Sequence, residues 1–247
     1  MKKRTPDRHD ALFSDLVALM ARLRSPSGCP WDREQDHRSL RPSLLEETYE
    51  VLEAIDRDDA EALRQELGDL LLQVVFHAQL ASEAGRFAID DVVTAIHGKL
   101  IARHPHVFGD TSAATPEEVL HQWDRLKRDE RGDGGADLVA GVPSTLPALA
   151  RAQVVQRRAA RAGFSRTPEE ARAAAVGALD RLAGAEGDSE AAQQAVGELL
   201  LAAVDLARAA SVDAEQALRE RVDGLMSQVR SRVRDPDASA QPRAGPG

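Results

Sequence analysis

Four acidic residues in the first third of the chain have the side-chain type and the spacing of a metal site. Glu47 and Glu50 are three residues apart, and so are Glu66 and Asp69. Residues at this spacing are neighbours on one face of an α-helix, about 5–6 Å apart at Cβ. Each pair therefore presents two carboxylates together, and carboxylate oxygens are the ligands that hard divalent cations take.

The surrounding segment predicts two helices joined by the acidic turn 56–59. In the first helix Glu46 and Glu53 fall on the same side as the first pair. The second helix is rich in apolar residues that we expect in the core, namely Leu63, Leu67, Leu70, Leu71, Val74 and Val75. Unpaired charge is costly beside buried apolar surface, and the first pair has no Lys or Arg within one turn. A divalent cation is the natural compensation.

A solvated helix face is the ordinary explanation of clustered glutamates, and either pair alone favours it. Two carboxylate pairs stand here on consecutive antiparallel helices, and one of them lies inside a Leu-rich run. This combination favours a metal site.

The arrangement of these pairs resembles the motif of the all-α NTP pyrophosphatases. In that motif E-x-x-E is followed by a spacer, here residues 51–65, and by E-x-x-D. The MazG branch is similar in several further stretches: GCPWDREQ (28–35), LLEETYEVLEAI (44–55), ELGDLLLQVVFHAQ (66–79), RHPHVFGD (103–110) and the spaced Trp123 and Lys127. The likeness is specific over residues 10–130 and continues more weakly to about residue 235.

The resemblance implies a Mg²⁺-dependent enzyme, with Mn²⁺ as a substitute, that converts an NTP or dNTP and water to the monophosphate and pyrophosphate. Cleaning of the nucleotide pool is a candidate role. The implied metal ligands and catalytic residues are Glu47, Glu50, Glu66 and Asp69. Glu46 and Glu53 are the candidates for supporting these ligands or for orienting water, and Glu46 is counted among the catalytic residues.

Basic and aromatic residues farther along are the candidates for substrate binding. Lys99 and Arg103 are four residues apart on a predicted helix that begins near 90 and ends before Pro105. By themselves they are equally well explained as exposed cations, but the resemblance implies that they meet the phosphates. Trp123 and Lys127 share the same spacing, and a Trp so placed is more often core. For these two the resemblance implies contact with the nucleotide.

The composition of the 247 residues bounds the fold and the partners. Aromatic residues are 3% of the chain and alternating β-branched runs are nearly absent, which predicts an all-α protein. A net charge of −9 argues against nucleic-acid polymers as partners, and no apolar run approaches the ~18 residues of a membrane span. With one cysteine and no evident signal peptide, we expect a cytoplasmic location.

We expect two tandem helical-bundle modules that resemble MazG, the second of them degenerate. Their predicted bounds are a catalytic module at 1–131, a linker at 132–145, the degenerate module at 146–233 and a disordered tail at 234–247. Residues 66–72 align with residues 195–201 at an offset of 129. The four ligand positions become Ala178, Arg181, Ala195 and Glu198 in the second copy. We therefore expect the second module to be a scaffold.

Two other functions remain open from the sequence. The first is a helical module that binds nucleotides or a protein without turnover. The second is a carboxylate di-iron bundle, because Glu34 with His37 and Glu118 with His121 have E-x-x-H spacing. Leu-rich faces on the central helices also need more cover than one module supplies, so we expect a homodimer.

Overall fold

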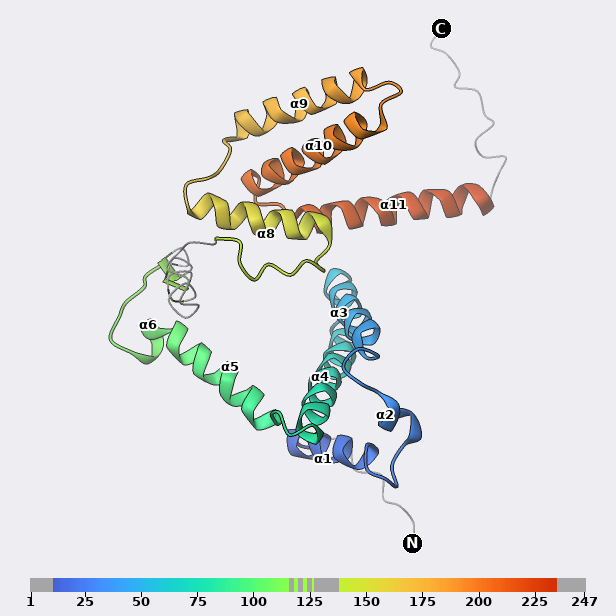
Figure 1. Cartoon of the computed structure of the whole chain (residues 1–247), viewed down its shortest axis with the longest axis vertical. Coiled ribbons are helices and arrows are strands. Elements are labelled where there is room, and N and C mark those ends of the chain that lie inside the picture. Colours follow the sequence, from blue (N-terminus) through green and yellow to red (C-terminus); the bar gives the residue numbers. More distant parts are fainter. Residues whose placement is uncertain (1–10, 116–117, 120–121, 124–125, 127–137, 235–247) are drawn as a thin grey trace. The chain divides into compact units, whose positions relative to one another are not determined.

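The computed structural model describes residues 11–115, 118–119, 122–123, 126 and 138–234 (Figure 1). Within these ranges the secondary structure is helical and contains no strand, so the all-α prediction is confirmed. The chain divides into two compact units, residues 1–127 and 128–247. The predicted tail, apart from its first residue, and the first part of the predicted linker lie outside the described residues. The finer module bounds stay predictions.

The first unit contains six described helices, α1 Phe13–Leu23, α2 Pro30–Glu34, α3 Arg41–Asp56, α4 Ala60–Glu83, α5 Ile89–Arg103 and α6 Pro105–Phe108. Three of them, α2, α3 and α6, carry a proline in the first turn. A proline is well tolerated there because the first N–H groups of a helix have no partner within it. Prolines in this sequence therefore start helices as well as ending them.

Helices α3 and α4 form an antiparallel hairpin (Figure 1). Asp58 in the connecting turn has a positive φ of 53°, and Asp59 is the N-cap of α4. The Asp59 side chain accepts hydrogen bonds from the backbone N–H groups of Glu61 and Ala62. The acidic turn predicted from the sequence thus serves to start α4.

The core of the first unit forms where α1 packs on α4. Its buried residues are Met20, Leu40, Val75, Phe76 and Leu80. Arg24 follows the last residue of α1 and contacts α4 beside this core. Its guanidinium lies 5.5 Å from the centre of the Phe76 ring and 2.7 Å from the Glu83 carboxylate. The core therefore fixes the orientation of α4 and, through the hairpin, of α3.

One face of α4 is apolar and exposed, which differs from the sequence expectation. Leu67, Leu71 and Val74 are 48%, 40% and 41% exposed, whereas Val75 is 1% exposed. The prediction of a buried core position was therefore wrong for the first three residues within this chain. Helix α4 is apolar on more than one side, and α1 covers only one of those sides.

The second unit contains four described helices, α8 Ala148–Arg161, α9 Pro168–Gly184, α10 Ser189–Ala209 and α11 Ala214–Arg234. Helices α9 and α10 form a second hairpin (Figure 1). Its turn has the same construction as the first, because Gly187 has φ 82° and the side chain of Asp188 caps the N-terminus of α10. These two residues lie 129 positions after Asp58 and Asp59, which is the offset of the sequence repeat.

None of the helices in the described ranges is both long enough and apolar enough to cross a membrane.

Candidate functional site

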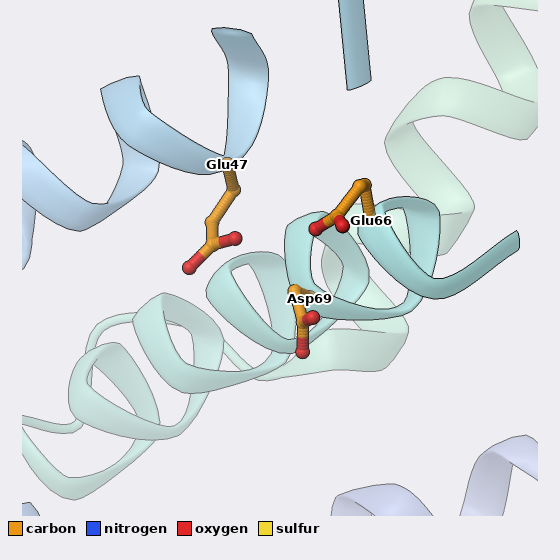
Figure 2. Close-up of side chains that lie close together, drawn as sticks. All are labelled: Glu47, Glu66 and Asp69. Atoms are coloured by element: carbon orange, nitrogen blue, oxygen red, sulfur yellow. The ribbon is translucent and has the colours of Figure 1, made fainter. Parts of the chain in front are cut away.

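Three of the predicted ligands come together between α3 and α4 (Figure 2). Glu47 projects from α3 toward Glu66 and Asp69 on α4. One carboxylate oxygen from each residue lies within 4.8 Å of the other two. Glu47 and Glu66 are half-buried and Asp69 is exposed, so the cluster opens to solvent on one side. A small divalent cation could take oxygens from both helices at once.

Glu50 is the fourth member of this cluster. Alongside burial, the negative charge of Glu50 raises the pKa of both Glu47 and Glu66, so its carboxyl lies close to theirs. The second predicted ligand of α3 is therefore also beside the ligands of α4. The hairpin brings together all four carboxylates that the spacing of the sequence singled out.

The raised pKa values in the cluster indicate that its negative charges are not compensated. Burial raises the pKa of Glu47, and the negative charges of Asp69 and Glu50 raise it further. The pKa of Glu66 is raised by burial first and then by the charges of Glu50 and Asp69. Like charges at short range resist ionisation unless an opposite charge compensates them. Hard oxygen donors with this charge fit Mg²⁺.

Helix α3 carries two more glutamates with different surroundings. Glu46 is exposed, and its charge adds to the raised pKa of Glu47, so it lies at the border of the cluster. Glu53 instead forms an ion pair with Arg57 at the end of the helix. Glu46 is therefore the better candidate for orienting a water molecule.

Comparison with known proteins agrees with this site. A family model described as the MazG nucleotide pyrophosphohydrolase domain matches residues 35–108. The nucleoside triphosphate pyrophosphohydrolase/pyrophosphatase MazG of Thermotoga maritima is 43% identical over 210 residues, which are 85% of this chain and 80% of that protein. The nucleoside triphosphate pyrophosphohydrolase of Escherichia coli K12 is 44% identical over 223 residues, 83% of this chain and 81% of that protein. The chain belongs to the MazG family.

Membership in the MazG family confirms the resemblance stated from the sequence and makes the chain an enzyme of the hydrolase class. The matched range 35–108 contains α3, α4 and α5 and therefore all four clustered carboxylates. The assignment of individual residues to metal and to substrate stays a prediction.

Three of the predicted substrate-binding residues, Lys99, Arg103 and Trp123, lie outside α3 and α4 in the first unit. Lys99 is exposed on α5, and Arg103 is the half-buried last residue of that helix. The Trp123 ring stands edge-on to the ring of His104, with 5.0 Å between their centroids. Lys127 lies outside the described residues. The contact of these four residues with a nucleotide stays a prediction.

His37, one residue of the di-iron alternative, forms a stacked pair with a second histidine. His37 stacks on His77 of α4 with 9° between the rings and 2.9 Å between the two Nδ1 atoms. Within the described ranges no cluster of three metal-binding side chains includes His37 or Glu34, and His121 lies outside those ranges. Among the described residues, Glu34 and His37 are therefore not part of a metal-binding cluster.

The second unit has an ion pair at the corresponding place. Arg181 on α9 binds Glu198 on α10, and Ala178 and Ala195 are buried between these helices. A cation of the protein itself thus compensates the one surviving carboxylate.

One polar residue near the cluster was not singled out by the spacing of carboxylates. Gln73 is buried on α4, one turn beyond Asp69. Its sequence signal is a single amide inside the apolar run Leu70–Val75.

Proposed function

We propose that this MazG-family chain is a Mg²⁺-dependent nucleoside triphosphate pyrophosphohydrolase. It converts an NTP or dNTP and water to the nucleoside monophosphate and pyrophosphate. The observation that carries this proposal is the meeting of carboxylates from α3 and α4, since it provides oxygen ligands and excess negative charge at one place. The relatives from Thermotoga maritima and Escherichia coli, which are named as nucleoside triphosphate pyrophosphohydrolases, support the same reaction.

The four carboxylates Glu47, Glu50, Glu66 and Asp69 would hold the metal ion. Bound Mg²⁺ supplies an electrophile that activates water and neutralises the charge that develops on the phosphates. Mn²⁺ takes similar oxygen ligands and is expected to substitute for it. Without the ion an acidic cluster repels a triphosphate, so substrate binding and metal binding depend on each other.

The remaining roles belong to side chains around the cluster. Glu46 orients the attacking water. The water oxygen forms a bond to the α-phosphorus while the bond to the bridging oxygen breaks, and pyrophosphate leaves with that oxygen. Lys99, Arg103 and Lys127 bind the phosphate tail, because fixed cations stabilise the departing charge. Trp123 packs against the base or sugar.

We further propose that the enzyme works in the cytoplasm and removes unwanted nucleotides from the pool. The single half-buried cysteine, Cys29, suits a reducing compartment. Nucleic-acid polymers are not expected as partners because the net charge is −9.

The deciding experiment measures pyrophosphate release from a panel of NTPs, dNTPs and oxidised dNTPs, with Mg²⁺ and with EDTA. We expect release with Mg²⁺ and none with EDTA, and the panel identifies the preferred base and sugar. A chain that binds nucleotides with Mg²⁺ present but releases no pyrophosphate is a binding module, and that result would overturn the proposal.

A further inference from the structure

Gln73 carries a buried polar atom that the protein does not satisfy. Gln73 is 6% exposed, and its side-chain Oε1 has no hydrogen-bond partner among the described residues. Most buried polar atoms in folded proteins are hydrogen-bonded, and an orphaned carbonyl oxygen requires an explanation. A ligand or an ordered water molecule is the usual one.

Gln73 lies on the face of α4 that carries the carboxylates Glu66 and Asp69. Helix α4 is continuous from Ala60 to Glu83. At about 100° per residue, Gln73 lies within about 40° of Asp69 and about 20° of Glu66 around the helix axis. Long side chains on a helix lean toward its N-terminus and over the preceding turn. The preceding turn on this face is the one that carries Asp69.

The second unit shows that the fold itself does not need an amide at this place. The residue 129 positions after Gln73 is Ala202 on α10, and it is 0% exposed. The corresponding hairpin therefore packs with a methyl group there. In that same hairpin the positions of Glu47 and Glu66 are also alanines, Ala178 and Ala195. The amide is present where the carboxylates are present and absent where they are lost.

We propose that Gln73 is a positioning residue of the metal site, whose Oε1 accepts a hydrogen bond from a water of hydration of Mg²⁺. This inference rests on the proposed function. Mg²⁺ gives up its water reluctantly and keeps several molecules of it in protein sites. Those molecules donate hydrogen bonds and need acceptors. A neutral amide oxygen accepts one without adding a fifth negative charge to Glu47, Glu50, Glu66 and Asp69.

The test compares Gln73→Met with wild type and with the control Gln79→Met. Met has the unbranched shape of Gln but lacks a strong acceptor. Gln79 is on the same helix, about 15 Å from Asp69 along the axis, and its Nε2 donates to Glu83 over 2.9 Å. Three quantities are measured: Mg²⁺ affinity by calorimetry without nucleotide, unfolding of the metal-free protein in EDTA, and pyrophosphate release.

We expect Gln73→Met to bind Mg²⁺ on the order of 10-fold more weakly, as is typical when a partner of the metal's own ligands is removed. The metal-free protein should be as stable as wild type or more stable, because the orphaned atom is gone. Gln79→Met should bind Mg²⁺ as wild type does. Gln73→Ala serves as a second variant should the Met variant not fold, because the second unit packs with alanine at this position.

Unchanged Mg²⁺ affinity in both Gln73 variants would overturn the inference, whether or not their metal-free stability falls. Lost stability with unchanged affinity would identify a structural amide that holds a buried water. The proposed function is tested separately in the wild type. Suppose that the wild type binds Mg²⁺ and releases pyrophosphate, and that the Gln73 variants are fully active with normal Mg²⁺ affinity. This outcome would contradict the role of Gln73 and leave the proposed function standing.

Discussion

The carboxylates between α3 and α4 are held together against their own repulsion. Helix packing fixes their backbones, and the raised pKa values of Glu47 and Glu66 record the resulting cost. Without a compensating cation, such a cluster of like charges opposes folding. Raised pKa values are common among residues that serve a function, as we propose for these carboxylates.

The substitution Glu66→Gln tests the contribution of this carboxylate to activity and its cost to stability separately. We expect pyrophosphate release to fall by orders of magnitude, because a metal ligand and a negative charge are lost. In EDTA at pH 7.5 the variant should unfold at a higher temperature than wild type. The folded pKa of Glu66 is raised above its ordinary value, so the charged form, which prevails above that pKa, opposes folding. Wild-type turnover, or a lower unfolding temperature in EDTA, would contradict this account.

The cations on α5 should act on substrate and not on the metal. Lys99→Ala and Arg103→Ala are expected to raise KM or lower kcat for pyrophosphate release. Each substitution removes a side-chain positive charge that we propose binds the phosphates of the substrate. Mg²⁺ affinity measured by calorimetry without nucleotide should stay nearly unchanged. If either variant weakens that affinity, its side chain belongs to the metal site.

At the scale of the helices, sequence patterns predicted where elements begin and end. The predicted turn between α3 and α4 and the predicted bounds of α5 lie close to the observed ones, because Asp59 and Pro105 act locally. The pairing of the two carboxylate pairs was also predictable, since a short turn makes α3 and α4 neighbours. Each of these features depends on a few residues that are adjacent in the chain.

Other features depend on what packs against an element and were not predictable. Leu67 and Leu71 are as apolar as a core residue, and only the placement of α1 shows that they stay exposed. Gln73 looks like one tolerated polar residue in an apolar run until its burial and its orphaned oxygen are known. The stacking of His37 on His77 joins residues 40 positions apart, which no local pattern encodes.

This histidine pair should make the first unit sensitive to acid. Burial lowers the pKa of His77, and the charge of His37 lowers it further. A histidine with a lowered folded pKa contributes stability above its ordinary value of 6.5, and this contribution is lost as the pH falls through the folded pKa. We therefore expect the unfolding free energy of the wild-type protein in EDTA to decrease in a step as the pH falls below 6.5.

His77→Gln should remove that step in urea unfolding measured between pH 7.5 and pH 5. His97→Gln is the matched control, because His97 is exposed on α5. Equal pH profiles for wild type and His77→Gln would contradict the role of the pair.

At the scale of the whole molecule, the second unit keeps a hairpin but lacks three of the four carboxylates of the site. The Arg181–Glu198 ion pair is largely solvent-exposed, so its contribution to stability is small. Glu198→Ala in the full chain should therefore change kcat by less than about threefold, which is under about 1 kcal/mol of barrier. Loss of pyrophosphate release in a Glu198→Ala protein that remains folded by circular dichroism would show that this unit is more than a scaffold.

The exposed apolar face of α4 leads to the last prediction, that two copies of the chain associate. Leu67, Leu71 and Val74 recur at helical spacing on the side of α4 away from Asp69, which is the pattern of a helix that packs against another. Exposed apolar stripes of this kind are rarely left uncovered in soluble proteins. We expect a homodimer by light scattering at micromolar concentration, with the active unit packed helix to helix against another unit.

Leu71→Lys should convert this dimer to a monomer, because two like charges would meet across the symmetric contact. The control is Leu200→Lys, at the position of α10 that lies 129 residues after Leu71 and is similarly exposed. It should leave the dimer intact if α4 forms the contact. A wild-type monomer at micromolar concentration contradicts the association. A dimer that survives Leu71→Lys but not Leu200→Lys would assign the contact to the second unit.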